Sequence, residues 1–185
     1  DARNQLRFVT QLRRDFYQVP FDPNNPDNSP NQMQQDANRE SDAYATFSWV
    51  RTFNPGLVLT VSPFYHFNRA AYESKSSDFP IAATDDRSSK YEGGQATLAY
   101  VKERNNLRAG AYGFGQQDDR FFDLSSNRQS ISGFPDREAI SGGMLALFAE
   151  DEFRVASWLT LSAGVRQTHF SGSVVENATS PRVGA

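Results

Sequence analysis

The clearest pattern in the chain is a period-two alternation of apolar and polar side chains near its C-terminal end. After a short turn at Ala156-Ser157-Trp158, the two kinds of residue alternate through the segment 159–170. Side chains two residues apart in a β-strand point to the same face of the sheet. One face therefore carries Leu159, Leu161, Ala163 and Val165, and the other carries Thr160, Ser162, Gly164 and Arg166. This pattern is typical of a half-buried sheet in water, and equally of a barrel wall between lipid and a wet lumen.

Similar patterns along the rest of the chain predict further strands. We expect about seven long strands, over residues 6–19, 40–53, 57–72, 91–102, 107–116, 145–156 and 159–170. Pro63 predicts a local bulge in the third strand because proline has no backbone N–H to give to a ladder. In the segment 107–116 the aromatic residues Tyr112 and Phe114 fall out of phase with Leu107 and Ala109, so the alternation assigns no faces there.

The connections between the expected strands are of two kinds. Short turns fall at Asn54-Pro55-Gly56, at Arg104-Asn105-Asn106 and near Ser157, whereas the segments 20–40, 73–90 and 117–140 are long and polar. Short turns at one end and long loops at the other are typical of an outer-membrane barrel, and structureless loops of ~20 residues are unusual in a compact soluble domain. The expected fold class is all-β: an antiparallel meander that forms an open section of a large transmembrane β-barrel.

Composition narrows the function classes. Hydrophobic residues make up 38% of the 185 residues and aromatic residues 13%, a combination that suits a wall in which only alternate residues face lipid. A formal net charge of −3 gives no basic field for nucleic acid, and the lack of cysteine excludes disulfides and thiolate metal sites. The sequence offers no transmembrane helix of ~20 apolar residues and no signal peptide, so we expect an internal piece of a longer protein.

Residue patterns that would indicate catalysis are missing. The two histidines, His66 and His169, lie far apart in sequence without acidic residues at ligand spacing, and no nucleophile elbow, phosphate-binding loop or H-E-x-x-H motif occurs. The sequence therefore predicts a protein that is not an enzyme and that has no cofactor and no metal site.

Four stretches together resemble the barrel of TonB-dependent outer-membrane receptors. They are the hairpin 145–170 with its acidic Glu150-Asp151-Glu152 cluster, the neighbouring segments 49–57 and 60–68, and the closing residues 180–185, which resemble the start of that family's following strand. The resemblance covers essentially the whole chain and implies a barrel of about 22 strands with a plugged lumen. In this family a plug domain and a TonB-binding segment precede the barrel. Residues 1–185 are therefore expected to be a partial β-barrel, a single-domain fragment without the plug or the barrel termini.

The resemblance also implies a function and a set of partners. It implies part of an active transporter in the outer membrane of a Gram-negative bacterium, which binds a scarce ligand and imports it with energy delivered by TonB. The expected partners are outer-membrane lipid, the TonB complex through a region outside this chain, and a small ligand such as a siderophore, cobalamin, an oligosaccharide or a peptide. No nucleic acid is expected. A passive porin-type channel is the alternative, followed by a soluble all-β binding module.

Alternation and position in the chain also predict site residues. The side chains expected to face lipid are Leu59, Val61, Tyr65, Phe67, Leu159, Leu161 and Val165, and those expected to form an aromatic girdle near the short turns are Trp49, Phe53 and Trp158. Ligand contacts are expected on the inner wall and at the loop bases, at Arg13, Asp15, Tyr17, His66, Asn68 and Gln116. Strands one and seven should be open edges, because the eighth strand only begins at Pro181.

Overall fold

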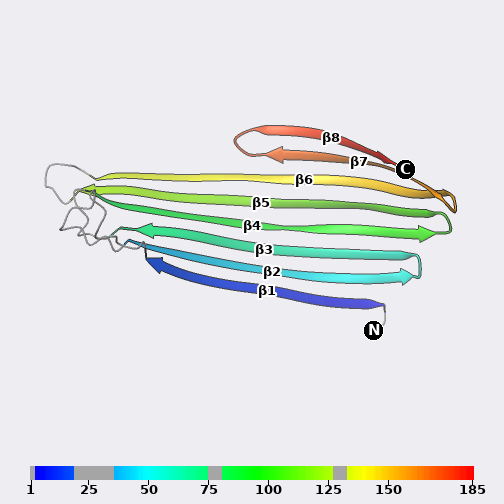
Figure 1. Cartoon of the computed structure of the whole chain (residues 1–185), viewed down its shortest axis with the longest axis horizontal. Helices are drawn as coiled ribbons and strands as arrows, with labels where there is room; N and C mark the ends of the chain where they lie inside the picture. Colours follow the sequence, from blue (N-terminus) through cyan, green and yellow to red (C-terminus); the bar gives the residue numbers. More distant parts are fainter. Residues whose placement is uncertain (1–2, 19–35, 75–80, 127–132) are drawn as a thin grey trace.

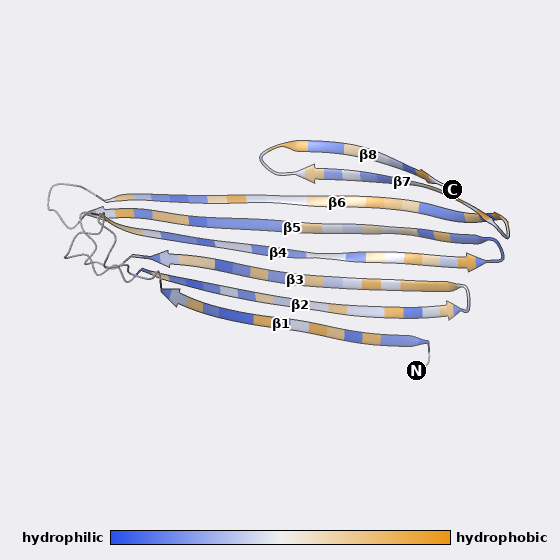
Figure 2. Ribbon diagram, viewed as in Figure 1, coloured by the Kyte–Doolittle hydropathy of each residue, from blue (hydrophilic) through white to orange (hydrophobic). Residues whose placement is uncertain are grey.

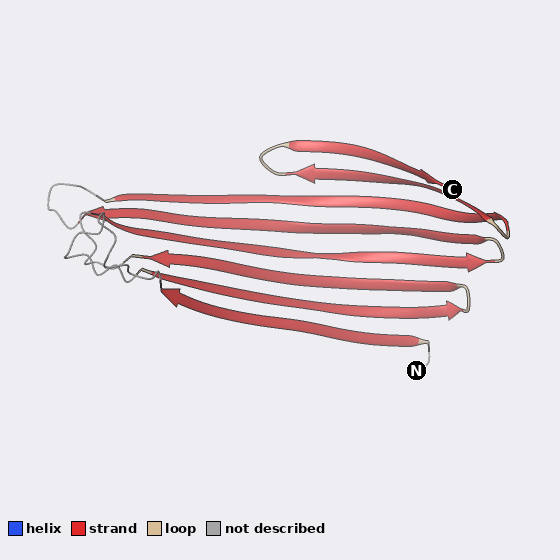
Figure 3. Ribbon diagram, viewed as in Figure 1, coloured by secondary structure: helices blue, strands red, loops and turns tan. Residues whose placement is uncertain are grey.

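All the regular elements of the computed structural model are β-strands (Figure 3). The structure describes residues 3–18, 36–74, 81–126 and 133–185. Its strands are β1 (Asn4–Gln18), β2 (Ala37–Asn54), β3 (Leu57–Glu73), β4 (Ile81–Lys102), β5 (Asn105–Ser126), β6 (Phe134–Ala156), β7 (Leu159–Ser171) and β8 (Val175–Gly184). They form one antiparallel sheet in chain order (Figure 1). The described residues contain no helix long and apolar enough to cross a membrane.

The predicted antiparallel meander is confirmed, and its sheet is open. In the described part of the chain β1 pairs with β2 and β8 pairs with β7, and no ladder joins β1 to β7 or to β8. Beyond the seven expected strands, Val175–Gly184 forms an eighth strand that pairs with β7 along its whole length, so this strand begins six residues before Pro181. β7 is therefore an inner strand, and β8 is the edge. The sequence of β8 has no apolar alternation, so only its backbone pairing reveals it.

The central strands are much longer than a membrane crossing requires. β4, β5 and β6 contain 22, 22 and 23 residues, whereas about 9–11 residues suffice to cross a bilayer. At about 3.3 Å per residue, each of these strands is roughly 70 Å long. Much of the segments 73–90 and 117–140, expected to be loops, is therefore strand. In this extended part of the sheet polar residues lie on both faces, as in the segment 85–89, so the sequence there does not alternate.

The short connections are two-residue turns at one end of the sheet. At the first, the Gly56 N–H donates a hydrogen bond to Asn54 Oδ1 at 3.0 Å, and the Val101 N–H donates to the Gly56 carbonyl at 2.7 Å. A Cβ at Gly56 would lie 2.2 Å from the Val101 carbonyl oxygen, so this close approach requires glycine. The second turn is at Glu103–Arg104, one residue earlier than predicted, and Glu103 has a φ of 52°. The third, at Ser157–Trp158, agrees with the predicted position.

The expected bulge at Pro63 does not form. Thr46 pairs with Phe64 and Trp49 pairs with Val61, which keeps the β2–β3 register unchanged on both sides of the proline. The Pro63 position simply lacks a ladder pair with β2, while its pairing with Gly94 of β4 is regular. The register shift between β2 and β3 lies instead between Thr52 and Asn54, next to the turn.

The register brings residues of one kind together on each face of the sheet. On the first face, which we call the apolar face, one cross-strand row contains Leu6, Trp49, Val61, Ala96, Ala111 and Leu147. The opposite face, which we call the polar face, has the row Arg7, Ser48, Ser62, Gln95, Tyr112 and Ala146. These rows settle the faces of β5: Leu107 and Ala109 belong to the apolar face, and Tyr112 and Phe114 to the polar face.

Exposure alternates between the two faces. Leu145 and Leu147 on the apolar face are 52% and 54% exposed, whereas Ala146 between them is fully buried. The neighbours that cover Ala146 lie on the polar face, where Tyr112 is its partner in β5. Along the strands, hydrophobic and hydrophilic residues alternate (Figure 2). In this central part of the sheet, side chains of the polar face therefore crowd together and those of the apolar face stand apart. Nearer the long connections, Ala37, Ala71 and Ala82 on the apolar face are buried as well.

Candidate functional site

Two adjacent cross-strand rows on the polar face contain the densest set of functional side chains. The register of β2 to β5 places Tyr44, His66, Tyr91 and Gln116 in the first row. The second row, two residues nearer the long connections, contains Arg13, Asp42, Asn68, Ser89 and Asp118. We call these the inner rows. Each strand supplies one residue to each row because the pairing is in register across the sheet.

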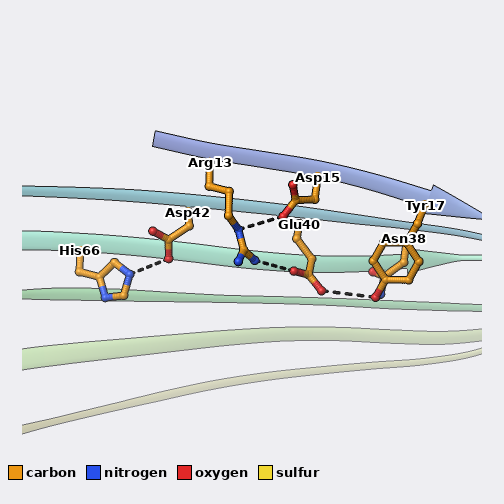
Figure 4. A network of polar contacts seen from close by, with 7 residues as sticks. All are labelled: Arg13, Asp15, Tyr17, Asn38, Glu40, Asp42 and His66. Atoms are coloured by element: carbon orange, nitrogen blue, oxygen red, sulfur yellow. Dashed lines mark hydrogen bonds and ion pairs between the residues drawn. The ribbon is translucent and has the colours of Figure 1, made fainter. Parts of the chain in front are cut away.

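At the β1 end, Arg13 connects two carboxylates. Arg13 Nε lies 2.9 Å from Asp15 Oδ2, and Arg13 Nη2 lies 2.7 Å from Glu40 Oε2 (Figure 4). The Tyr17 hydroxyl donates to Glu40 Oε1 at 3.4 Å and accepts a hydrogen bond from the Asn38 side-chain amide. These polar groups extend the site beyond the inner rows toward the long connection between β1 and β2. The guanidinium fork is fixed by two carboxylates, so its orientation is set before any ligand arrives.

His66 is held between a carboxylate and two aromatic rings. Its Nε2 lies 2.8 Å from Asp42 Oδ2 (Figure 4). The imidazole stacks on Tyr91 with ring centroids 5.7 Å apart, and it meets Tyr44 edge-on at 5.9 Å. Neighbours on the two adjacent strands, β2 and β4, therefore contact the His66 ring.

The aromatic contacts continue across the sheet. Tyr91 contacts Phe114 at 6.3 Å between centroids, Phe114 contacts Tyr112 at 6.0 Å, and Tyr112 stacks on Phe64 at 6.2 Å. At the β5 end of the inner rows, the Gln116 side-chain amide donates to the Tyr91 hydroxyl at 3.3 Å and to Asp118 Oδ2 at 2.6 Å. The Ser89 hydroxyl donates to Asp118 Oδ1 at 2.5 Å. A continuous set of contacts thus runs from β2 to β5.

The site can offer ring faces, acceptors and one cation to a ligand. Its four carboxylates, on Asp15, Glu40, Asp42 and Asp118, outnumber the single guanidinium of Arg13, so its net charge is −3 when His66 is neutral. Carboxylates only accept hydrogen bonds, whereas Gln116 and Asn68 both accept and donate. Aromatic faces beside a few fixed polar groups are typical of small-molecule sites. Among the described residues, no group of three metal-binding side chains is placed to hold a metal ion.

The structure places all six predicted ligand residues on the polar face. Five of them make the contacts described above, and Asn68 lies in register between Asp42 and Ser89. Sequence reasoning missed Glu40, Asp42, Tyr91 and Asp118. The first two were accessible to it, because Glu40 and Asp42 alternate with the apolar Ala43 and Trp49 in the strand expected over residues 40–53. Tyr91 was accessible too, because it alternates with Ala96 and Leu98 in the strand expected over residues 91–102, whereas Asp118 lies in a segment that was expected to be a loop.

The residues predicted to face lipid all lie on the apolar face. Leu59, Val61, Tyr65 and Phe67 alternate along β3, and Leu159, Leu161 and Val165 alternate along β7. The three predicted girdle aromatics lie at the short-turn end. Trp49 Nε1 donates to Asn4 Oδ1 at 3.3 Å, Arg51 lies 5.2 Å over the Phe53 ring, and Trp158 is 83% exposed.

Beyond the inner rows, toward the long connections, ion pairs hold the extended strands. Arg87 donates to Asp85 through Nε at 3.0 Å and Nη2 at 2.5 Å, and Arg120 Nε lies 3.7 Å from Asp85. The hydrogen bonds from Arg87 are the main cause that lowers the pKa of Asp85 below its ordinary value of 3.8, with a smaller contribution from the charge of Arg120. A lowered pKa favours the folded state at pH values above 3.8, and this contribution disappears as the pH falls through the folded-state value.

We expect Arg87→Gln to raise the titration midpoint of Asp85 toward 3.8, because the donors that favour the carboxylate are removed. The midpoint can be followed by carboxyl ¹³C NMR of aspartate-labelled protein. Arg137→Gln is the matched control, since Arg137 lies on the apolar face over the Phe121 ring and does not contact Asp85. A wild-type midpoint at or above 3.8 would contradict the assignment.

The arrangement of turns, strands and faces defines a class of protein. An antiparallel meander of long strands, with two-residue turns at one end, an apolar face and a polar face, is the wall of a β-barrel of the outer-membrane type. A family model described as "TonB dependent receptor-like, beta-barrel" matches residues 1–185, the whole chain, and the chain belongs to this family. It is a family of outer-membrane transport proteins of Gram-negative bacteria, not of enzymes. Among curated proteins, none matches the chain.

Proposed function

We propose that this chain is part of the barrel wall of a TonB-dependent active transporter, and that the inner rows contact the small ligand it imports. The family match over the whole chain is the observation that carries the first half of the proposal. It favours an energised receptor over a passive porin or a soluble binding module. The ligand would be captured from outside the cell, and energy from TonB, acting through a region outside this chain, would release it inward.

The second half of the proposal depends on which face looks into the barrel. We infer that the polar face is the inner one. The alternation of exposure supports this, because side chains on the concave side of a curved wall crowd together and those on the convex side separate. The run from Leu57 to Phe67 on the apolar face supports it too. Its 11 residues, tilted at about 45°, match an outer apolar band about 25 Å tall.

The geometry of the inner rows supports ligand contact more than mere wall structure. Charged groups on an inner wall need hydrogen-bond partners. The partner of Asp42 is His66, and those of Asp118 are Ser89 and Gln116, so neither carboxylate is paired with an arginine. Each therefore keeps its negative charge close to the stacked His66–Tyr91 pair. Acceptors and ring faces are offered together at the part of the wall nearest the long connections, where an external ligand would arrive.

We expect His66→Ala in the intact receptor to weaken ligand uptake by roughly tenfold in apparent affinity. The substitution removes two ring contacts and leaves Asp42 without its hydrogen-bond partner, a loss of about 1.5–3 kcal/mol for a bond to a charged group. Uptake of the ligand into cells that express the variant is the measurement. His169→Ala is the matched control, because His169 lies on the apolar face and contacts Asn177 of β8.

Two outcomes would contradict the proposal for these residues. Unchanged uptake for His66→Ala, Asp42→Ala and Gln116→Ala alike would mean that the inner rows do not contact the ligand. An equal loss for His66→Ala and His169→Ala would mean that the effect reports on the stability of the wall. Surface levels of each variant, measured with an antibody to an extracellular tag, separate lost binding from lost assembly.

A further inference from the structure

A second cluster of charged side chains lies on the polar face, close to the short turns. The register of β5 to β8 places Arg108, Glu150, Gly164 and Arg182 in one cross-strand row, and Arg166 follows in the next row toward the long connections. We call Arg108, Glu150, Arg166 and Arg182 the basic cluster. Arg108 and Gln116 share a face of β5 eight residues apart, so roughly 26 Å of strand separates the cluster from the inner rows.

The two arginines of the first row share a single carboxylate, and neither holds it closely. Arg108 Nη1 lies 3.7 Å from Glu150 Oε1, and Arg182 Nη1 lies 4.0 Å from Glu150 Oε2. A charge-assisted hydrogen bond between guanidinium and carboxylate is about 2.7–2.9 Å long, so both pairs are loose contacts. Each guanidinium has five N–H donors and therefore keeps donors for a further acceptor.

The side chain of Arg166 has no partner among the described residues. It forms no ion pair with them, and its Nε atom is buried without a hydrogen-bond acceptor. Its neighbours in the row are Phe148 and Ser180, so no carboxylate lies opposite it in either ladder. A buried donor without an acceptor is unfavourable, because it has lost its hydrogen bond to water. An oxygen acceptor that enters the cluster would satisfy it.

A glycine keeps a hollow open beside Arg166. The hollow has a volume of about 180 Å³ and is bordered by Glu150, Gly164, Arg166 and Arg182, together with neighbouring residues of β6 and β7. A Cβ at Gly164 would lie 2.8 Å from Glu150 Cβ, so a larger residue would require a shift of β6. Sites for drug-sized ligands measure about 300–1,000 Å³. This hollow therefore suits one charged group of a ligand.

The charge of the basic cluster favours an anion. Its three guanidinium groups face one carboxylate, so its net charge is +2. Glu152, the next acid along β6 on this face, accepts a hydrogen bond from Asn106 at 3.0 Å and does not border the hollow. Arg154 follows Glu152 on the same face and offsets its charge. The inner rows have a net charge of −3, so the two ends of one face attract opposite charges.

We propose that Arg166, together with Arg108 and Arg182, binds the oxyacid group, a carboxylate or a phosphate, of a small molecule inside the barrel. The planar fork of an arginine matches two oxygens of such a group. This inference rests on the proposed function, in which the polar face looks into the lumen. The short turns of an outer-membrane barrel are periplasmic, so an imported molecule meets the basic cluster after the inner rows. The inner rows repel an oxyacid group and the basic cluster attracts it, which favours inward movement of that group.

The test uses the intact receptor that contains this chain, purified in a neutral detergent at low ionic strength. Inorganic phosphate and succinate are the probes, and isothermal titration calorimetry gives their dissociation constants. Arg166→Gln is expected to weaken binding of the preferred probe about tenfold, the loss typical of a hydrogen bond to a charged group. Arg166→Lys keeps the charge without the planar fork and should lose less. Arg7→Gln is the matched control, because it removes the same charge from the polar face on β1, far from the cluster.

Glu150→Gln separates anion binding from a structural role of the cluster. The substitution removes the carboxylate that competes for Arg108 and Arg182. Binding of the probe should therefore become tighter, by up to about fivefold, the upper limit for an exposed ion pair. Weaker binding after Glu150→Gln would show that the ion pairs only hold the wall together, and would overturn the proposal.

The remaining outcomes are equally distinct. Tighter binding of succinate than of phosphate would assign a molecule with a carboxylate, and the reverse order a phosphorylated one. Equal losses for Arg166→Gln and Arg7→Gln would mean an effect of net charge and would overturn the proposal. Absence of binding of both probes would overturn it too, and would mean that the receptor itself supplies the acceptor. Uptake by His66→Ala reports on the inner rows alone, so failure of anion binding and failure of the proposed function are seen separately.

Discussion

Replacement of Val61 by arginine should destabilise the assembled barrel by roughly 2–4 kcal/mol, the cost of a basic side chain near the bilayer midplane on the lipid face. Val61 lies near the centre of the apolar run from Leu57 to Phe67, and its row neighbours Trp49 and Ala96 are apolar. The free energy of unfolding in lipid vesicles, measured against denaturant, is the test.

Ser62→Arg provides the matched control for this prediction. Ser62 is the next residue along β3 and lies on the polar face, where its hydroxyl pairs with that of Ser48 at 2.8 Å. Arginine there would stand in a wet lumen, so we expect a change several times smaller than for Val61. The reverse order, with Ser62→Arg the more damaging, would show that the apolar face is the inner one. The ligand and lipid assignments would then both be wrong.

Replacement of Gly93 by valine should prevent normal pairing of β4 with β5 and lower the yield of folded receptor. A Cβ at Gly93 would lie 2.3 Å from the Gly113 carbonyl oxygen and 2.6 Å from Phe114 Cβ. Neither atom belongs to the flexible end of a side chain, so the strands themselves must move apart. Overpacking of this kind costs typically 1–3 kcal/mol.

Gly115→Val is the control, in the strand that faces Gly93. A Cβ at Gly115 has no neighbouring atom within 4 Å, because this glycine lies on the exposed apolar face. We expect its effect on stability to stay within about 0.5 kcal/mol, as is usual for exposed sites. Thermal unfolding followed by circular dichroism measures both variants. Similar melting temperatures for the two would contradict the argument from close packing.

The part of the fold that could be predicted from sequence is the part that lies between two different environments. In β3 and β7, apolar and polar side chains alternate. The alternation from Leu57 to Phe67 and from Leu159 to Val165 therefore predicts both that these segments are strands and which residues share a face. The turn at Pro55-Gly56 was recognisable because proline fixes φ and glycine accepts a positive φ. No described glycine has a positive φ, and Gly56 is required instead by its close approach to Val101. The order of the strands followed from these turns.

The strands that were not predicted lie where both faces of the sheet carry polar residues, so no alternation marks them. β4 and β5 extend well past the inner rows, and segments such as Asp85–Ser89 carry polar residues on both faces. Their pairing depends on backbone hydrogen bonds and on ion pairs such as Arg69–Asp86, which a single sequence does not reveal. The beginning of β8 was placed too late, at Pro181 instead of Val175, for the same reason.

Some residues of the candidate site were predicted and others were missed, and the reason is again the alternation within single strands. His66 and Asn68 were found because β3 alternates cleanly, and Gln116 because it ends the recognisable portion of β5. Their partners Asp42, Tyr91 and Asp118 come from neighbouring strands, and only the register shows that they share two rows. The sequence shows which residues of one strand share a face, whereas the pairing of residues between strands requires the structure.

β6 has 23 residues and β7 has 13, so the two neighbouring strands end at different levels of the sheet. β6 pairs with β5 from Phe134 onward, but with β7 only from Gly143 onward, so residues 134–142 have a neighbour on one side alone within the described sheet. The step corresponds to roughly 30 Å of strand. Beside this step the β7–β8 hairpin is shorter than β6 (Figure 1). The described sheet therefore has an exposed length of β6 edge there, and the backbone N–H and C=O groups along it can pair with an added strand.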